Sequence, residues 1–360
     1  MRTFKHFQYW LALISLVVVF GCPQKKDKAP AEEKPATSGK TATAEKPASQ
    51  ELLPGSWEAD VRDNLLKMIA KHGKDNVKYD AANPPVVVFD FDNTCIRGDI
   101  GRAFFDHMVS QRKIKFNDLI FDALPADKRE AIRKVWDQIS KLPADKQADS
   151  VQLQEFRKLM HQAYWSLCNQ PDPTKCFPWQ VRFYAGYTPD QLVRLAAEVM
   201  ESELKRKLGS EQIKAGPDDK APAITSTGIR IYKEITDLMV LLRKKGIKVW
   251  VVTAGPQWVV TGAARRFAVA EGQVIGMRTK LDKGLLTTEM EPPPTFKEGK
   301  VEAIKKFIKV KPILVLGDSW TDAEMMEYAE NAILLDRGYA DLKKKALDSG
   351  WWIQPPFNVQ

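Results

Sequence analysis

Two carboxylates two residues apart follow a continuous apolar run. Residues 84–89 read Pro-Pro-Val-Val-Val-Phe, and Asp90, Phe91, Asp92, Asn93 and Thr94 come directly after them. Because two close carboxylates repel each other, such a pair needs a cation or a division of roles between acid and base. Asp, Asn and Thr are also common in turns and helix caps. The motif therefore indicates metal binding or acid–base chemistry, with a turn as the structural alternative.

A second acidic pair follows another apolar run. Residues 313–317 precede Asp318, and Asp322 comes four residues later. Ligands of parallel sheets bind at the carboxyl ends of the strands, where both pairs would meet. Two acidic clusters at one edge would repel each other without a cation, and oxygen ligands favour Mg²⁺. The sequence therefore predicts a Mg²⁺ site built from Asp90, Asp92, Asp318 and Asp322.

Two further motifs could bind a phosphate group. Thr253, Ala254 and Gly255 end a third apolar run, where a hydroxyl and backbone N–H groups can donate hydrogen bonds to phosphate. Lys300 stands at the start of an expected helix, where a cation opposes the helix dipole and indicates anion binding. An ordinary turn and a solvated lysine explain each motif separately. They do not explain why the motifs recur at the ends of apolar runs.

The apolar runs alternate with helical patterns along the chain. This alternation predicts an α/β fold with a doubly wound parallel sheet. Strands are expected over residues 84–89, 247–253, 313–317 and 332–335, with a hairpin over 274–281 and 285–291. Helices are expected over residues 57–72, 229–245, 257–270, 298–308 and 322–328. An inserted α-helical cap is expected after the first strand, with helices over 99–111, 126–140, 151–167 and 189–208 and a polar stretch over 215–226.

In their order along the chain, these motifs resemble the four motifs of the haloacid dehalogenase (HAD) superfamily. The similarity covers about residues 84–355, and helices inserted directly after the first motif resemble the phosphoserine phosphatase-like branch. The resemblance implies a Rossmann-like fold and a Mg²⁺-dependent phosphomonoesterase acting on a small phosphorylated metabolite. An aspartate at the position of Asp92 argues against the dehalogenase branch, which lacks this acid/base.

The resemblance also assigns roles to the motif residues. Asp90 is expected to attack phosphorus and form an aspartyl-phosphate, and Asp92 to protonate the leaving alcohol and then activate water. Thr253 and Lys300 are expected to hold the phosphoryl oxygens. Mg²⁺ is expected to bind Asp90, the Asp92 backbone carbonyl and Asp318, while Asp322 orients Lys300 or the water shell of the metal.

Substrate recognition is expected in the cap. Phosphoserine phosphatases place a glutamate seven residues after the second aspartate, where this chain has Asp99, and use a cap arginine, for which Arg182 is the candidate. The cap is also rich in aromatic residues, which pack a cap core or cage a quaternary ammonium group. These are Tyr164, Trp165, Phe177, Trp179, Tyr184 and Tyr187. A phosphorylcholine- or phosphoethanolamine-type phosphatase and a non-catalytic lipoprotein that binds phosphorylated ligands are the alternatives.

The amino terminus has the features of an export signal. Residues 1–21 contain Arg2 and Lys5 before an apolar run, and the following Cys22 resembles the lipidated cysteine of a bacterial lipobox. Residues 22–55 are rich in Lys, Ala, Pro and Glu and are expected to form a disordered tether. We expect export and a lipid anchor in a bacterial membrane, on its periplasmic or cell-surface side. The phosphatase core is expected over residues 56–98 and 227–360, with the cap over 99–226.

Composition and cysteines limit the other possibilities. The net charge is +9, and removing residues 1–21, which carry two basic and no acidic residues, leaves +7. This excess favours anionic substrates, but no basic run interleaved with aromatic residues indicates nucleic-acid binding. In an oxidising compartment Cys168 and Cys176 are expected to form a disulfide, although two free thiols give the same sequence pattern.

Overall fold

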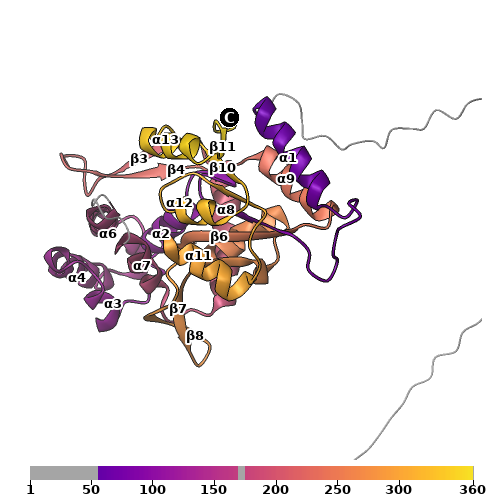
Figure 1. Cartoon of the computed structure of the whole chain (residues 1–360). Coiled ribbons are helices and arrows are strands. Elements are labelled where there is room, and N and C mark those ends of the chain that lie inside the picture. Colours follow the sequence, from indigo (N-terminus) through magenta and orange to yellow (C-terminus); the bar gives the residue numbers. More distant parts are fainter. Residues whose placement is uncertain (1–55, 169–174, 360) are drawn as a thin grey trace, which may run out of the picture. The chain divides into compact units, whose positions relative to one another are not determined.

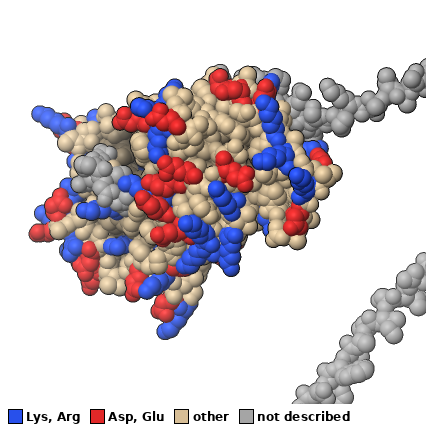
Figure 2. All heavy atoms as spheres, in the orientation of Figure 1, with Lys and Arg blue, Asp and Glu red and all other residues tan. Residues whose placement is uncertain are grey.

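The structure, a computed structural model, describes residues 56–168 and 175–359 (Figure 1). The expected signal peptide, the lipidation site Cys22 and the tether lie outside the described residues. Within the described part of the chain, no helix combines the length and apolar character needed to cross a bilayer. On the face drawn in Figure 2, basic and acidic side chains are interspersed rather than separated by sign.

Strand β1 (Val86–Phe89) lies at the centre of a seven-stranded sheet with the order β11-β10-β9-β1-β6-β7-β8. Its four residues are β-branched or aromatic and all are buried, as a central parallel strand requires. β1 pairs in parallel with β6 (Lys248–Pro256) on one side and with β9 (Leu314–Gly317) on the other. The chain therefore builds the sheet outward in both directions, and the strand order reverses between β1 and β9.

The outer strands extend the sheet on both sides. β10 (Ala332–Leu335) and β11 (Trp352–Gln354) follow β9 in parallel, and β7 (Val274–Asp282) pairs in parallel with β6. Among the described strands of this sheet, only the edge strand β8 (Leu285–Glu291) is antiparallel, because it returns from β7 as the predicted hairpin.

Helices cover both faces of the sheet. Val87 and Phe89 of β1 face one apolar cluster, and Val86 and Val88 face another, because side chains alternate along a strand. The first cluster includes α1 (Ala59–His72), α9 (Lys233–Lys244) and α10 (Gln257–Ala264). The second includes α11 (Glu298–Ala303), α12 (Ala323–Tyr328) and α13 (Ala340–Asp348). The predicted doubly wound α/β fold is confirmed.

The insert after β1 forms a helical cap, drawn in purple and magenta in Figure 1. The short strand β2 (Ile96–Arg97) leads into it, and Thr188 caps its last helix in a capping box with Gln191. Its helices are α2 (Ile100–Ser110), α3 (Asp118–Asp122), α4 (Ala126–Ser140), α5 (Ala144–Gln147), α6 (Val151–Cys168), α7 (Cys176–Val181) and α8 (Pro189–Lys205).

A hairpin in the cap corrects the expectation of a purely helical insert. β3 (Gly209–Ile213) and β4 (Ala223–Thr227) pair antiparallel where the sequence predicted a polar stretch. Trp165 of α6 donates its Nε1–H to the carbonyl oxygen of Ile224 at 2.9 Å. The strands are mostly polar, so their stability depends on this packing rather than on a strong strand pattern. Residues 230–231 likewise form a strand, β5 (Arg230–Ile231), and α9 therefore begins later than predicted.

A disulfide links the end of α6 to the start of α7. Cys168 and Cys176 are bonded, with Cα atoms 4.9 Å apart. We expect a Cys168→Ser/Cys176→Ser variant to lose about 2–3 kcal/mol of unfolding free energy, because the bond restricts the unfolded chain. Urea unfolding should show the same loss for wild type under reducing conditions and no further loss for the reduced variant. Equal stability of oxidised and reduced wild type would contradict this.

Candidate active site

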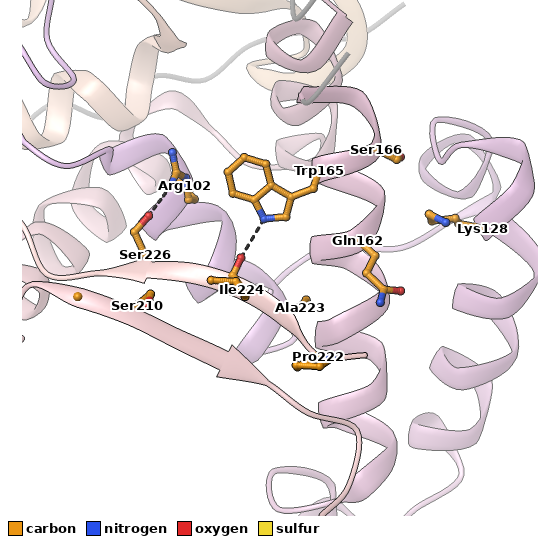
Figure 3. A pocket seen from close by; sticks show the side chains of 11 residues that line it. Arg102, Lys128, Gln162, Trp165, Ser166, Ser210, Pro222, Ala223, Ile224 and Ser226 are labelled. Carbon is orange, nitrogen blue, oxygen red and sulfur yellow. Dashed lines mark hydrogen bonds between the residues drawn. The ribbon is translucent and has the colours of Figure 1, made fainter. Parts of the chain in front are cut away.

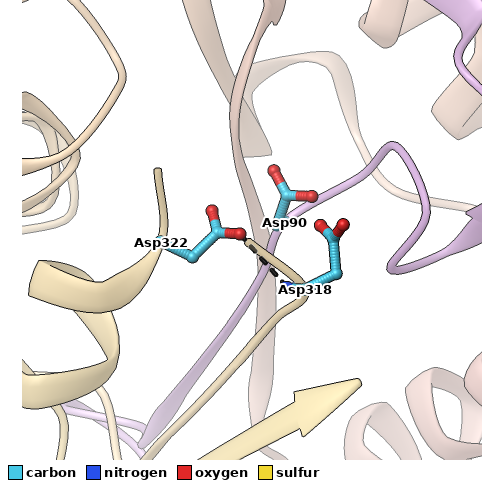
Figure 4. A group of neighbouring side chains, drawn as sticks. All are labelled: Asp90, Asp318 and Asp322. Atoms are coloured by element: carbon cyan, nitrogen blue, oxygen red, sulfur yellow. Dashed lines mark hydrogen bonds between the residues drawn. The ribbon is translucent and has the colours of Figure 1, made fainter. Parts of the chain in front are cut away.

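The carboxylates of the two acidic motifs meet between β1 and β9, where the strand order reverses. Asp90 directly follows β1, and Asp318 directly follows β9. Such switch points open a crevice at the carboxyl ends of the strands. Asp90, Asp318 and Asp322 are all buried, and each offers a carboxylate oxygen within 4.8 Å of the others (Figure 4). The sheet topology thus brings together groups more than 220 positions apart in sequence.

Lys300 supplies the buried positive charge behind this cluster. Its Nζ donates to Asp90 Oδ1 at 2.7 Å, to Asp322 Oδ1 at 2.6 Å and to the Val252 carbonyl oxygen at 2.9 Å. Burial alone would lower the pKa of Lys300, but the charges of Asp322 and Asp90 raise it above the usual value. Three acceptors use the three ammonium hydrogens, so Lys300 remains charged and holds Asp90 in place.

The contacts of Asp322 favour a positioning role. Its Oδ1 accepts from Lys300, while its Oδ2 accepts the backbone N–H groups of Asp318 and Ser319, each at 3.1 Å, and the Ser319 hydroxyl at 3.0 Å. Both oxygens are therefore engaged within the protein. Of the two roles predicted for Asp322, orientation of Lys300 fits these contacts better than direct metal binding.

The two carboxyls of the first motif have different surroundings. Burial raises the pKa of Asp90 to about 6, with a further increase from Asp322 and an opposing effect from Lys300. Burial also raises the pKa of Asp92 well above its usual value, and the nearby charges of Asp99, Asp90 and Asp318 add to this. Asp92 Oδ1 accepts the backbone N–H of Ile100 at 2.7 Å. A lysine-bound carboxylate beside a readily protonated carboxyl is the division of roles that acid–base chemistry requires.

A cavity of about 200 Å³ opens onto these groups. Thr253, Ala254 and Gly255 line it together with Asp90 and Asp92. The Gly255 N–H donates to Thr253 Oγ1 at 3.0 Å, and a Cβ added at Gly255 would lie 3.2 Å from Asp92 Oδ2. Gly255, near the end of β6, therefore lies close to Asp92, and a larger side chain would crowd that carboxylate. Lys300 does not line the cavity itself. It contacts Asp90, which does.

The two cap residues predicted to bind substrate lie in different places. Asp99 lines the cavity, but its carboxylate also caps α2 by accepting the Arg102 N–H at 2.8 Å. Arg182 is not among the lining residues, because it lies in the segment before Gly186, which packs on β8 through the Leu286 carbonyl oxygen. The structure therefore does not bring Arg182 to the cavity.

The aromatic residues of the cap do not form one cage. Tyr164 and Phe177 line the cavity, whereas the ring of Trp165 faces the guanidinium of Arg102 at 5.0 Å. Trp179 is buried against Phe183, with ring centroids 4.5 Å apart. Most of the aromatic set thus packs the cap core, as the structural alternative predicted.

Arg337 is a site residue that the sequence reasoning missed. It lines the cavity, and its Nη1 donates to Asp318 Oδ2 at 2.7 Å. The sequence could have indicated Arg337 as a site residue. It comes two residues after β10, at the same edge of the sheet as Asp90 and Asp318. A search for charged residues after every predicted parallel strand would have found it.

Comparison with known proteins agrees with this geometry. A family model of haloacid dehalogenase-like hydrolases matches residues 171–327, which include Thr253, Lys300, Asp318 and Asp322. This segment, which is less than half of the chain, is similar to that family. Asp90 and Asp92 precede the matched residues, and the sheet topology brings them to the other motifs. None of the curated proteins matches the sequence significantly.

Solved structures with a similar fold were also found. A conserved protein of unknown function from Anaerococcus prevotii has a TM-score of 0.71 and 25% identity, covering 83% of this chain and 92% of that chain. A phosphoserine phosphohydrolase-like protein from Francisella tularensis has a TM-score of 0.40 and 13% identity, covering 75% and 94%. Cytosolic 5'-nucleotidase IIIB bound to cytidine has a TM-score of 0.41 and 14% identity, covering 83% and 86%. The last two have TM-scores below 0.5 and carry no argument about this chain.

Proposed function

We propose that the protein is a Mg²⁺-dependent phosphomonoesterase that hydrolyses a small phosphorylated metabolite through an aspartyl-phosphate on Asp90. The observation that carries this proposal is the arrangement around the 200 Å³ cavity. There Asp90 is held by a buried lysine, and Asp92 is a second carboxyl with a raised pKa. The amide and hydroxyl groups of residues 253–255, at the carboxyl end of β6, complete a setting suited to a phosphoryl group.

The chemistry follows from the two carboxyls. A carboxylate oxygen of Asp90 attacks phosphorus, the bond from phosphorus to the ester oxygen breaks, and protonated Asp92 gives its proton to the leaving alkoxide. The Asp92 carboxylate then accepts a proton from water as that water attacks phosphorus. The bond between Asp90 and phosphorus breaks, phosphate leaves and Asp92 is protonated again. Lys300 fixes Asp90 during both steps.

The donor set fits a divalent cation. Asp90, Asp318 and the backbone carbonyl of Asp92 are the groups that would hold Mg²⁺, because buried oxygen ligands with several negative charges suit a hard cation. When bound, Mg²⁺ would neutralise charge on the phosphoryl oxygens. Among the described residues, Lys300 and Arg337 are the cations paired with the three buried carboxylates of this cluster, which supports a need for further positive charge.

Protons should compete with Mg²⁺ for this site. The pKa of Asp90 is raised to about 6 and that of Asp318 well above its usual value, both mainly by burial. Because the metal needs ionised carboxylates, we expect its apparent affinity to fall as the pH is lowered from about 8 to about 5. Isothermal titration calorimetry with MgCl₂ over this range measures the change. An affinity independent of pH would contradict the assignment of these ligands.

An Asp92→Asn variant separates the two steps. We expect kcat on alkyl phosphates to fall by roughly 10²–10⁴-fold, because no group protonates the leaving alkoxide. With p-nitrophenyl phosphate the nitrophenolate leaves without a proton, so the first step survives and the second remains slow. Stopped-flow absorbance should then show a burst of nitrophenolate equal to the enzyme concentration. An equal loss on both substrates, without a burst, would contradict this role.

Magnesium-dependent release of phosphate from p-nitrophenyl phosphate tests the function as a whole. Wild-type enzyme should be active with MgCl₂, lose activity with EDTA and regain it when MgCl₂ is restored. A protein that binds phosphate but releases none from any phosphomonoester would instead be the non-catalytic alternative. The phosphorylcholine-type alternative is less well supported, because the aromatic rings of the cap do not converge on the cavity.

The location of the enzyme remains a proposal from the sequence. We propose that it is exported and attached to a bacterial membrane through lipidated Cys22, as the signal-like residues 1–21 suggest. Incorporation of labelled palmitate into wild type, but not into a Cys22→Ser variant, would show the anchor. Recovery of unlabelled wild type in the soluble fraction would contradict it.

A further inference from the structure

A second cavity adjoins the active-site cavity and has no part in the mechanism above. It has a volume of about 340 Å³ and shares three lining residues with the active-site cavity, namely Asn93, Asp99 and Arg337. The leaving group of a substrate whose phosphate lies at Asp90 would therefore have this space within reach. The residues that line the second cavity therefore determine which leaving groups fit there.

The lining of the second cavity is strongly basic. It contains three arginines, Arg97, Arg102 and Arg337, and a single carboxylate, that of Asp99. Asp99 Oδ2 lies 3.4 Å from Arg102 Nη2, and Arg337 forms an ion pair with Asp318. Among the described residues, Arg97 has no ion pair, and its Nη1 has a carbonyl contact to Val359 at 3.5 Å. The cavity therefore has more positive than negative charge, with Arg97 the arginine least compensated.

Arg102 is held in place before any ligand binds. It contacts the Ser226 hydroxyl on β4, and its guanidinium lies over the Trp165 ring at 5.0 Å (Figure 3). Its Nε is buried and has no hydrogen-bond partner in the part of the chain that the structure describes. A fixed guanidinium loses little freedom when it binds an anion, and its planar donors match carboxylate or phosphate oxygens. The β3–β4 hairpin, which the sequence did not predict, thus helps to position Arg102 through Ser226 of β4.

We propose that the second cavity binds a second anionic group of the substrate, a carboxylate or a phosphate, next to the phosphoryl group that is removed. This inference rests on the proposed phosphomonoesterase function and narrows its substrate class. Arg97 and Arg102 determine specificity and take no part in the chemical steps. A cationic leaving group such as choline would be repelled by the same guanidiniums.

Two substrate pairs test the proposal, each differing in the second anion. Phosphoserine carries a carboxylate that phosphoethanolamine lacks, and fructose 1,6-bisphosphate carries a phosphate that fructose 6-phosphate lacks. We expect wild type to prefer the member with the second anion by roughly tenfold or more in kcat/KM in at least one pair. The pair that shows the preference distinguishes the two anions.

Arg97→Gln is the decisive variant, because Arg97 has no ion pair with any described residue and its hydrogen bond to the Val359 carbonyl oxygen is long, at 3.5 Å. We expect its preference to fall through a higher KM, with activity on p-nitrophenyl phosphate unchanged and partial recovery in Arg97→Lys. Arg194→Gln is the matched control, since Arg194 is exposed on α8 and lines neither cavity. A preference equal in wild type and Arg97→Gln, or absent from both pairs, would overturn the proposal.

A binding measurement keeps the inference separate from the proposed activity. Two proteins, Asp90→Asn and Asp90→Asn/Arg97→Gln, are titrated with each substrate by calorimetry. This measurement needs no turnover. Tighter binding of the doubly anionic ligands that depends on Arg97 would support the second site even if no phosphomonoester were hydrolysed. Hydrolysis of p-nitrophenyl phosphate without any such binding preference would support the phosphomonoesterase function but refute the second anion site.

Discussion

An Asp90→Asn variant releases no measurable phosphate and lowers kcat by roughly ten-thousandfold or more, because the attacking oxygen is lost. The substitution keeps the size of the side chain, and the amide oxygen can still accept from Lys300 Nζ, which lies 2.7 Å from Asp90 Oδ1. The fold should therefore survive. Initial rates with p-nitrophenyl phosphate and an alkyl phosphate at saturating MgCl₂ measure the loss.

The matched control for this variant is Asp118→Asn. The Asp118 side chain is 89% exposed on the cap and makes a surface ion pair with Arg133, so its activity should equal that of wild type. Circular dichroism should show all three proteins folded. An Asp90→Asn variant that still turns over alkyl phosphates at a substantial rate would remove Asp90 from the role of nucleophile.

A Lys300→Met variant loses about 3–5 kcal/mol of unfolding free energy together with its activity, because a buried ion pair is broken on one side only. Lys300 is fully buried, and its removal leaves Asp90 and Asp322 without their shared cation. It also leaves the Val252 carbonyl oxygen without its lysine donor. Urea unfolding of metal-free protein near neutral pH measures the change.

The stability loss of Lys300→Met should depend on pH. Lys300 opposes the rise that burial causes in the pKa of Asp90, so without the ammonium group the folded state favours protonated Asp90 more strongly and binds more protons than the unfolded chain. The deficit relative to wild type therefore shrinks as the pH is lowered from about 7 to about 5. Lys305→Met, which changes an exposed lysine close along the chain, should stay within about 0.5 kcal/mol of wild type. A loss below about 1 kcal/mol for Lys300→Met would contradict the buried-cation account.

The sequence was sufficient for the sheet and for the core motifs. Continuous apolar runs are typical of buried parallel strands, and each of the runs before Asp90, Thr253 and Asp318 is such a strand. The rule that parallel strands share one functional edge then predicted that these motifs meet. Lys300 lies in α11, the helix that follows the hairpin. Its position at the start of this helix indicated anion binding.

The cap was harder to predict because its contacts depend on tertiary packing. β3 and β4 have no strong strand pattern and rest on α6 through Trp165. Arg182 was chosen by position in a loosely similar region, whereas helix packing turns that segment toward β8. The basic cavity draws Arg97, Arg102 and Arg337 from three separate elements, so no local motif could reveal it.

Trapping of the phosphorylated enzyme tests the central claim most directly. Wild type and Asp92→Asn would be mixed with p-nitrophenyl phosphate and MgCl₂, quenched in acid and treated with borohydride, which reduces an aspartyl-phosphate to homoserine. Mass spectrometry should then find homoserine at position 90, and more of it in Asp92→Asn, where the second step is slow. Rapid phosphate release with aspartate unchanged at position 90 in both proteins, or homoserine at another position, would contradict the proposed mechanism.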